Sequence, residues 1–375
     1  MPNRGLKRAV LIALLSAWAS KTFAKKSGET ISGRVLLFLR PGAISELSQG
    51  RKVLLVSGTN GKTSTTRFLV RIIEQLGAVT TSPSGSNLSW GVAGSLLKRA
   101  SFAVLEVDEL HLANVITQTQ PEVVLLLNLT RDQLHRMHEV KRVADRWREI
   151  AERSPNTTFV VDIDDPFVNY ATQNAAKVFR ISFGGRSHPD GAVCPNCGGY
   201  MKWSSGLYEC SCGLSNKSYE KLLVAASAPE RNSILANIAG SLIGAPWLEV
   251  SPSELERTIN IKSGGVTATI RLTKNPASWT EALTGINSHQ VILILNAREV
   301  DGIDTSWLYD VDFQILQGRK VVVTGERALD MQYRLHVQGI ESIAVENFTT
   351  AITQFSSGEH VQVLSAYTAF FELSR

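Results

Sequence analysis

The segment KVLLVSGTNGKTSTTRFLVRII, residues 52–73, constrains the fold of this chain more than any other part of its sequence. Four apolar residues, Val53 to Val56, lead into a turn of serine, glycine, threonine and asparagine, and apolar residues at helical spacing run from Phe68 to Ile73. This order predicts a buried strand, a tight loop and a helix. Backbone N–H groups at such a helix start converge on phosphate, so we expect the segment to hold a nucleotide triphosphate.

The loop is shorter than the common G-x-x-x-x-G-K-[ST] pattern but offers the same groups. Its glycines permit a close backbone approach to phosphate, Lys62 would neutralise phosphate charge, and the Thr63 hydroxyl would ligate Mg²⁺. An ordinary turn with a surface lysine is the alternative, which the flanking strand and helix disfavour. The predicted phosphate-binding residues are Gly58, Thr59, Asn60, Gly61, Lys62, Thr63 and Ser64.

Two further apolar runs end in polar residues, as strands of a parallel sheet do beside a ligand. FAVLEVDEL, from Phe102, ends in acids, of which we choose Glu106 as the second magnesium residue and expect Glu109 to be a solvated edge residue. EVVLLLNLTRDQLHR follows, and it places Asn128 and Asp132 near the expected nucleotide. Strands that alternate with helices predict an α/β fold with a mostly parallel sheet.

The chain has 375 residues, enough for two or three domains, and its 43% hydrophobic and 19% charged residues are ordinary for a globular protein. Its net charge of +5 is unevenly distributed, because residues 1–52 contain ten Lys/Arg and two Asp/Glu and the remainder is therefore net negative. A nucleic-acid-binding body is not indicated. The basic arm leaves open a peripheral contact with an anionic membrane surface.

The N-terminal arm, residues 1–50, combines basic residues with an apolar run like a secretory signal. The run from Ala9 to Ala19 is too short to span a bilayer as a helix. We therefore expect an amphipathic or buried helix, with an export signal or anchor as the alternative. A nucleotide-using enzyme needs cytosolic ATP, so we expect a cytoplasmic protein.

All four cysteines lie within CPNCGGYMKWSSGLYECSCG: Cys194, Cys197, Cys210 and Cys212. Two close pairs separated by twelve residues are typical of a structural zinc ribbon, here an insertion at about 190–216. The second pair is Cys-x-Cys, one residue shorter than usual. Two disulfides or free buried thiols are the alternative. The only charged residues within 194–213 are Lys202 and Glu209. A nucleic-acid-binding ribbon would be basic, so this composition argues against one.

GTNGKTS, EVDE and NLTRDQLHR together resemble the Mur ligase superfamily, whose members use ATP to convert a carboxylate into an acyl phosphate that an amine attacks. NSILANIAG, around Asn237, resembles the helix whose asparagine contacts the nucleotide base in that family. The resemblance implies a central ATPase domain at 51–260 that carries the ribbon, followed by a smaller C-terminal α/β domain at 261–375. His135 and His138 depart from the family pattern, in which aspartate and glycine are usual.

The C-terminal third, above all DGIDTSW at 301–307, resembles the ligase subunit of the two-subunit enzymes that amidate peptidoglycan precursors. The resemblance implies amidation of the α-carboxylate of D-glutamate in lipid II to D-isoglutamine. Ammonia would come from a GatD-like glutamine amidotransferase partner, whose Cys–His–Asp triad an aspartate of this chain would complete. The candidates are Asp304, which we prefer, Asp301 and Asp310, with Lys62 as the catalytic lysine of the ATPase site. An amino-acid-adding ligase of the Mur or folylpolyglutamate type and a non-catalytic cell-wall scaffold remain alternatives.

Overall fold

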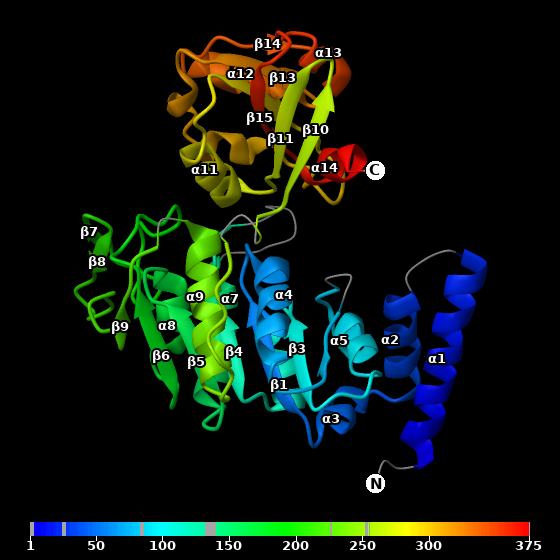
Figure 1. The fold of residues 1–375 in the computed structure, drawn as a ribbon. Helices are drawn as coiled ribbons and strands as arrows, with labels where there is room; N and C mark the ends of the chain where they lie inside the picture. The colour runs from blue at the N-terminus through cyan, green and yellow to red at the C-terminus, as the bar shows by residue number, and fades with distance from the viewer. Residues whose placement is uncertain are drawn as a thin grey trace. The chain divides into compact units, whose positions relative to one another are not determined.

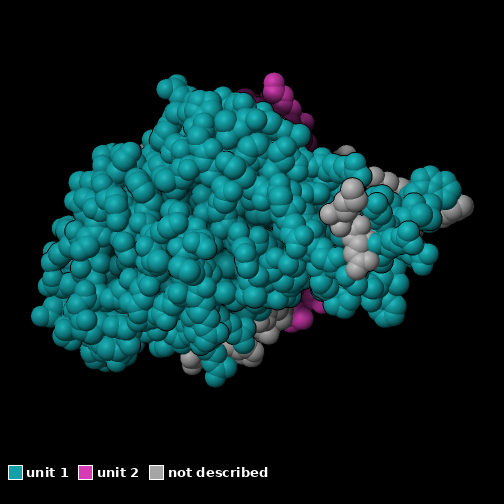
Figure 2. Space-filling model, turned by 90° about the horizontal axis from the view of Figure 1, so that it is seen from below, with its two compact units in different colours: residues 1–129, 140–255 teal, residues 130–139, 256–375 magenta. Residues whose placement is uncertain are grey.

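The computed structural model describes residues 4–24, 28–82, 86–131, 140–225, 227–251, 254 and 256–374. The chain divides into two compact units, 1–129 with 140–255 and 130–139 with 256–375 (Figure 2). Each unit has its own sheet and its own apolar core.

The first unit is built on a seven-stranded sheet in which all neighbouring strands are parallel. Along the sheet the strands are β2 (Val79–Thr80), β3 (Phe102–Glu106), β1 (Lys52–Ser57), β4 (Val123–Leu126), β5 (Thr158–Asp162), β6 (Val178–Ser182) and β9 (Lys221–Leu222). The first strand in the chain, β1, lies inside the sheet, with β3 on one side and β4 on the other. In such sheets the carboxyl ends beside the central strand form the ligand edge.

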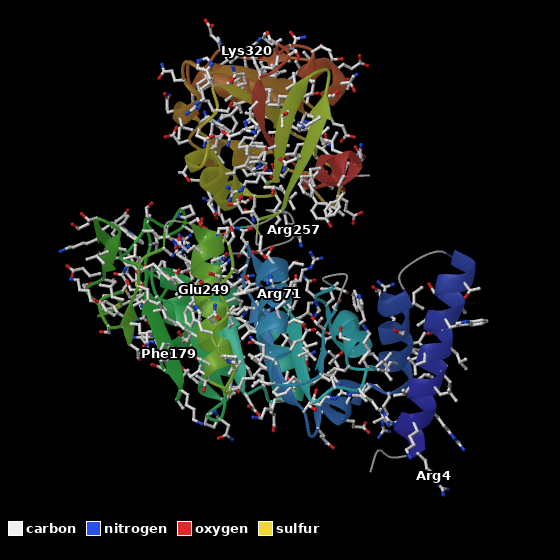
Figure 3. The ribbon with its side chains drawn as sticks, viewed as in Figure 1. Arg4, Arg71, Phe179, Glu249, Arg257 and Lys320 are labelled. Carbon is white, nitrogen blue, oxygen red and sulfur yellow. The ribbon has the colours of Figure 1, made fainter. Side chains whose placement is uncertain are left out.

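The continuous apolar run of β1 is explained by helices on both faces of the sheet (Figures 1 and 3). Leu54 and Val56 belong to a core that includes Phe68 of α4 and Leu235 of α9. Val53 and the other odd-numbered strand residues point to the opposite face and are buried there too. The predicted α/β fold with a mostly parallel sheet is thus confirmed.

Nine helices are described in the first unit. They are α1 (Arg4–Ala24), α2 (Gly28–Leu39), α3 (Ala43–Ser48), α4 (Lys62–Ile73), α5 (Ser89–Ser95), α6 (Leu112–Thr119), α7 (Val140–Glu152), α8 (Pro166–Thr172) and α9 (Ala228–Ser241).

The N-terminal arm is part of this first unit: α1 packs on α2, and α2 packs on α5 (Figure 1). The second contact is close, because a Cβ built at Gly33 of α2 would lie 1.7 Å from the carbonyl oxygen of Trp90 in α5. Among the helices that the structure describes, none has the length and apolarity needed to cross a bilayer.

The segment between β6 and β9 contains a small antiparallel hairpin, β7 (Lys202–Ser204) and β8 (Leu207–Glu209). It is joined to the sheet by buried polar contacts. The Tyr208 hydroxyl donates to the carbonyl oxygen of Ile163 at 2.8 Å, and the Asn216 amide donates to Asp164 at 2.8 Å. The hairpin is therefore fixed to the carboxyl end of β5.

The second unit has a six-stranded sheet that is parallel except for its first hairpin. Its strands in sheet order are β10 (Thr258–Ser263), β11 (Val266–Leu272), β15 (His360–Ser365), β12 (Gln290–Ile294), β13 (Lys320–Thr324) and β14 (Ile343–Ala344). The helical segments are α11 (Pro276–Thr284), η1 (Ser306–Asp310), η2 (Gln314–Leu316), α12 (Ala328–Val337), α13 (Phe348–Ile352) and α14 (Tyr367–Leu373).

Aromatic packing fixes one side of this second sheet. The ring of Trp279 in α11 lies 5.9 Å from the ring of Trp307 in η1 and 6.2 Å from that of Phe313. All three side chains are buried in the same core. The tryptophan of the DGIDTSW motif is therefore a core residue that anchors the loop in front of it.

Candidate functional site

The glycine loop after β1 adopts the geometry that its sequence predicts. Gly61 has a φ of 85°, a left-handed conformation that favours glycine, and α4 begins at the next residue. At Gly58, with a φ of 141°, a Cβ would lie 2.9 Å from the carbonyl oxygen of Asn128. Both glycines are thus required by the backbone path, which brings the start of α4 to the carboxyl edge of the sheet.

Lys62 is folded onto its own loop and paired with an acid. Its Nζ lies 2.5 Å from the carbonyl oxygen of Gly58 and 3.0 Å from Oε1 of Glu109. The exposed fractions are only 8% for Lys62 and 5% for Glu109. An ion pair removed from water in this way holds both charged side chains in place, because either charge alone would be costly to bury.

The expectation that Glu109 is a solvated edge residue is wrong. The turn that contains it is covered by α7, whose Trp147 indole N–H donates to the Glu109 carbonyl oxygen at 2.9 Å. Trp147 is itself fully buried. The acid at the end of the FAVLEVDEL run therefore faces the phosphate loop rather than solvent.

Thr63 and Ser64 lie in the first turn of α4 and are half-buried. Glu106, the other predicted magnesium residue, is at the carboxyl end of β3 and is paired in register with Val56 of β1. The carboxylate is buried, and its Oε1 lies 3.5 Å from the Asn87 side-chain amide. A threonine hydroxyl and a carboxylate are oxygen ligands that suit Mg²⁺, and both stand at this one edge of the sheet.

Asn128 holds the loop in place. Its side-chain oxygen accepts from the Asn60 backbone N–H at 2.9 Å, and its amide donates to the Asn60 carbonyl oxygen at 3.0 Å. The Asn128 carbonyl oxygen accepts from the Thr59 N–H at 2.9 Å. These three contacts fix the phosphate loop to the end of β4. Asp132, His135 and His138 lie outside the described residues.

The two asparagines of α9 have different surroundings. The Asn237 amide donates to the carbonyl oxygens of Ser233 and Leu248, and its oxygen accepts from the Leu248 N–H. The two contacts with Leu248 hold the chain after α9, and the one with Ser233 lies within the helix. Asn232 is the one that faces the phosphate loop, since its Nδ2 would lie 2.3 Å from a Cβ at Gly61. Sequence reasoning missed Asn232, although it starts the same quoted segment.

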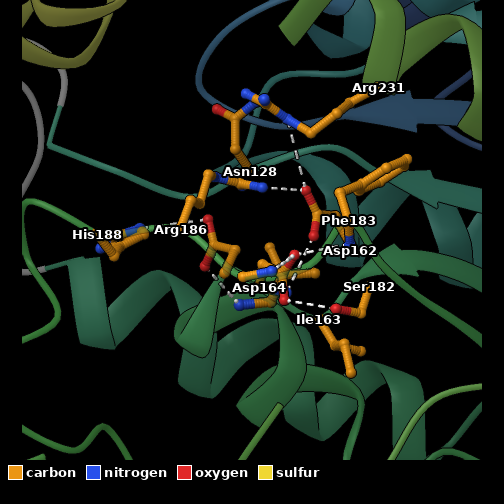
Figure 4. A network of polar contacts seen from close by, with 12 residues as sticks. Asn128, Asp162, Ile163, Asp164, Ser182, Phe183, Arg186, His188 and Arg231 are labelled. Carbon is orange, nitrogen blue, oxygen red and sulfur yellow. Dashed lines mark hydrogen bonds and ion pairs between the residues drawn. The ribbon is translucent and has the colours of Figure 1, made fainter. Parts of the chain in front are cut away.

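A buried acidic cluster at the end of β5 was also missed (Figure 4). Asp162, Asp164 and Asp165 are all at most 1% exposed. Asp164 accepts from the Ser182 hydroxyl and from the backbone N–H groups of Phe183 and Gly185. The sequence pattern that predicts this cluster is the same one that pointed to Glu106: acidic residues directly follow an apolar strand.

Two arginines face Asp162 in this cluster (Figure 4). Arg186 forms an ion pair with it, and Nε of Arg231 lies 4.0 Å from the same oxygen. Burial raises the pKa of Asp162 even though Arg186 opposes the shift. The cluster therefore holds two arginine side chains beside its buried carboxylates.

Asp165 joins three separate segments. One oxygen caps α8 by accepting from the N–H groups of Phe167 and Val168, and the other accepts from the Leu129 N–H at 2.7 Å. His188 Nε2 lies 3.3 Å from that second oxygen. Burial alone would raise the pKa of Asp165, but His188 and the Leu129 N–H hold it below its usual range. An ionised Asp165 thus fixes the chain directly after Asn128.

The four predicted cysteine ligands converge. Their sulfurs lie within 4.8 Å of one another, with 3.7 Å from Cys194 to Cys212 and 3.4 Å from Cys197 to Cys210. Tetrahedral zinc at about 2.3 Å from each sulfur requires separations of about 3.8 Å, so the set fits one metal ion. The alternative of two disulfides is not what the structure shows, since all four thiols are free.

The shortened Cys-x-Cys pair reaches the cluster because each knuckle ends in a left-handed glycine. Gly198 follows Cys197 with a φ of 74°, and Gly213 follows Cys212 with a φ of 93°. The Leu214 N–H lowers the pKa of the Cys212 thiol to about 6, whereas burial raises that of Cys194 to about 12. The backbone of the second knuckle therefore favours the thiolate form that zinc binding requires.

The three candidate aspartates of the second unit are not equivalent. Asp301 is buried, and its oxygens accept from the N–H and the hydroxyl of Thr368 at 2.8 and 2.7 Å. Asp304 is exposed and accepts from the Ser306 N–H at 2.8 Å. Asp310 is exposed and lies 3.1 Å from Nη1 of Arg131 in the same unit. Asp301 thus anchors α14, while the other two reach the surface.

Comparisons with known proteins agree with this architecture. Residues 56–200 match the Mur ligase middle domain, and residues 272–370 match the MurT ligase C-terminal domain. The MurF ligase from Thermotoga maritima, solved in complex with ADP, has the same fold, with a TM-score of 0.59 at 16% identity over 91% of this chain and 82% of that chain. The parallel sheet, the phosphate loop and these matches define the class: the chain has a Mur ligase middle domain and is similar to members of the Mur ligase superfamily.

Within that superfamily the chain is similar to one kind of subunit over nearly its whole length. It is 26% identical to subunit MurT of the glutamine-hydrolyzing lipid II isoglutaminyl synthase from Streptococcus pneumoniae, over 92% of this chain and 91% of the relative. The same subunit from Staphylococcus aureus strain N315 is 24% identical over 89% and 88%. The prediction of a ligase with this resemblance is confirmed.

Proposed function

We propose that this chain is the ligase subunit of an enzyme that amidates the D-glutamate α-carboxylate of lipid II to D-isoglutamine. The observation that carries the proposal is the match of both parts of the chain, a Mur ligase middle domain in the first unit and a MurT-type C-terminal domain in the second. We place the reaction at the cytoplasmic side of the membrane, where ATP and a lipid-linked substrate meet.

The phosphate loop supports an ATP-dependent first step. The N–H groups at the start of α4 would hold the phosphates, and Lys62 would exchange Glu109 for phosphate as its charge partner. The substrate carboxylate would attack the γ-phosphorus to give an acyl phosphate, with ADP as leaving group. Phosphoryl transfer of this kind depends mainly on positioning and charge neutralisation.

Mg²⁺ would be held by Thr63 and Glu106, where it would neutralise charge on the transferring phosphate. Asn128 would contribute by keeping the loop fixed, since both of its amide atoms are bound to Asn60. Asn232 stands beside Gly61 and is our candidate for a direct contact with the nucleotide, in addition to Asn237 and Asp132.

The surface of the second unit supports a protein partner that supplies ammonia. Arg334 is buried and donates to the carbonyl oxygens of Leu308 and Val311, which fixes η1 against α12. These adjacent elements expose large apolar side chains, namely Tyr309, Leu329 and Tyr333. An apolar patch beside exposed Asp304 and Asp310 fits a GatD-like glutaminase whose triad lacks an aspartate.

The cysteine cluster is proposed to hold structural Zn²⁺. We expect the purified protein to contain zinc in a one-to-one ratio and the Cys194→Ser variant to contain none. The variant should melt about 5 °C or more below the wild type, because loss of a bound metal is a large destabilisation. Metal analysis and thermal unfolding measure both effects. The matched control is Ser211→Ala, which changes the exposed residue between two ligands and should alter neither.

The decisive assay combines this chain with a glutamine amidotransferase subunit, lipid II, ATP, Mg²⁺ and glutamine, and follows conversion of carboxylate to amide by mass spectrometry. Amidation that requires both subunits supports the proposal. Addition of an amino acid without a partner would instead identify an amino-acid-adding ligase. A stable, zinc-loaded complex with neither activity would indicate a scaffold, with the departures at His135 and His138 as the first positions to revert.

A further inference from the structure

Helix α1 buries one face, made mostly of alanines, and exposes large apolar side chains on the other. Leu6, Ala9 and Ala13 are buried against the rest of the arm. On the opposite face, five residues expose between 47% and 61% of their surface, and we call them the apolar stripe: Leu11, Ile12, Leu14, Leu15 and Trp18. A helix that only served the core would turn these large residues inward.

The charge on α1 is of one sign. Arg4, Lys7 and Arg8 are exposed and precede the apolar stripe on the same helix face, because residues three, four and seven apart share a face. Figure 3 shows Arg4 at the N-terminal end of this helix. The helix contains no Asp or Glu. The body of the chain after residue 52 is net negative, so the arm is the cationic part of the molecule.

We propose that α1 binds flat in the interfacial region of an anionic lipid bilayer through the apolar stripe. The cationic turns before the stripe would face lipid phosphates, and Trp18 would lie at the boundary between headgroups and acyl chains, a position that tryptophan favours. A protein-docking helix has no need of uniformly cationic charge on its apolar face. A net-negative body would be repelled by an anionic surface, which leaves α1 as the side that approaches the membrane.

The arrangement holds α1 in a fixed orientation relative to the first unit. It packs on α2, which in turn packs on α5 with the close contact at Gly33. Membrane binding would therefore orient the whole first unit rather than tether it through a flexible tail. The inference stands on the arm alone and does not depend on the proposed amidation.

The test is vesicle flotation of the full chain, with phosphatidylcholine alone and with added phosphatidylglycerol, at low and high salt. We expect the wild type to bind the anionic vesicles at least about tenfold better than neutral ones, and high salt to reduce this preference. Leu11→Ser/Leu15→Ser should lose binding to both. Arg4→Gln/Lys7→Gln/Arg8→Gln should bind anionic vesicles only as well as neutral ones.

Two matched variants distinguish membrane binding through α1 from non-specific hydrophobic adsorption and from misfolding. Val224→Ser removes an apolar residue that is 89% exposed elsewhere in the first unit and should float like the wild type. Trp18→Phe should still float but lose the vesicle-induced blue shift of tryptophan emission. All changed residues are exposed, and circular dichroism verifies that the variants are folded.

Flotation of the Leu11→Ser/Leu15→Ser variant at the wild-type level would overturn the proposal. The proposal would also be overturned if the wild type does not bind anionic vesicles and the Leu11→Ser/Leu15→Ser substitution abolishes self-association or partner binding. Sedimentation without lipid measures that association. In that case the apolar stripe would be an interface between proteins.

Discussion

The Lys62→Met variant should amidate lipid II about 10²- to 10³-fold more slowly than the wild type, whether glutamine or free ammonium is the nitrogen source. The reason is that Lys62 acts before ammonia does, by neutralising the phosphate that the substrate carboxylate attacks. Its position in the first turn of α4, at the carboxyl edge of β1, leaves no other described lysine in the loop to replace it. Initial rates with saturating ATP measure the loss.

Stability must be separated from activity in this experiment, because Lys62 is paired with buried Glu109. Removing one partner of a buried ion pair costs about 3–5 kcal/mol, so the single variant should also melt earlier. The double variant Lys62→Met/Glu109→Gln removes both charges and should recover most of the thermal stability without recovering activity. A stable double variant that amidates at the wild-type rate would falsify the assigned role of Lys62.

The Asp304→Asn variant should lose glutamine-driven amidation by about 10³-fold or more while keeping ammonium-driven amidation. A carboxylate that orients the histidine of a partner's triad affects only the release of ammonia from glutamine. Asparagine has nearly the same shape and still offers an oxygen to the Ser306 N–H, so the turn should persist. Measuring both nitrogen sources with the same complex gives the ratio directly.

Asp310→Asn is the matched control, because Asp310 is also exposed and ends the 3₁₀ segment that begins two residues after Asp304. If the selective loss appears with Asp310→Asn and not with Asp304→Asn, the triad residue is Asp310 and our preference is wrong. Loss of both nitrogen sources in either variant would mean that the aspartate acts on the ligase reaction or on folding. Asp301 is unsuited to this test, since its carboxylate is used by Thr368.

The features that could be predicted from sequence are those encoded by neighbouring residues. The strand, loop and helix from β1 to α4 follow from an apolar run, two glycines and a helical apolar spacing within one short segment. The convergence of the cysteines follows from their spacing in the same way. The second pair, Cys-x-Cys, is one residue shorter than usual, and the left-handed Gly213 explains how it reaches the cluster.

The features that could not be predicted depend on contacts between distant segments. The burial of Glu109 results from Trp147, thirty-eight residues further along the chain, which covers its turn. The Asp162–Asp165 cluster draws partners from both sides of the hairpin insertion and from α9. Asn232 faces the loop because α9 packs on α4, and the motif alone pointed to Asn237 instead.

The docking of the β7–β8 hairpin has a consequence for how this kind of chain can be shortened. Tyr208 and Asn216, beside the cysteines, bond to Ile163 and Asp164. The next residue, Asp165, binds the chain directly after Asn128. Excision of the insertion would therefore expose the backbone that steadies the phosphate loop. A lineage that discards the metal must first evolve substitutes for these contacts, so the cysteines and the nucleotide site should be inherited together.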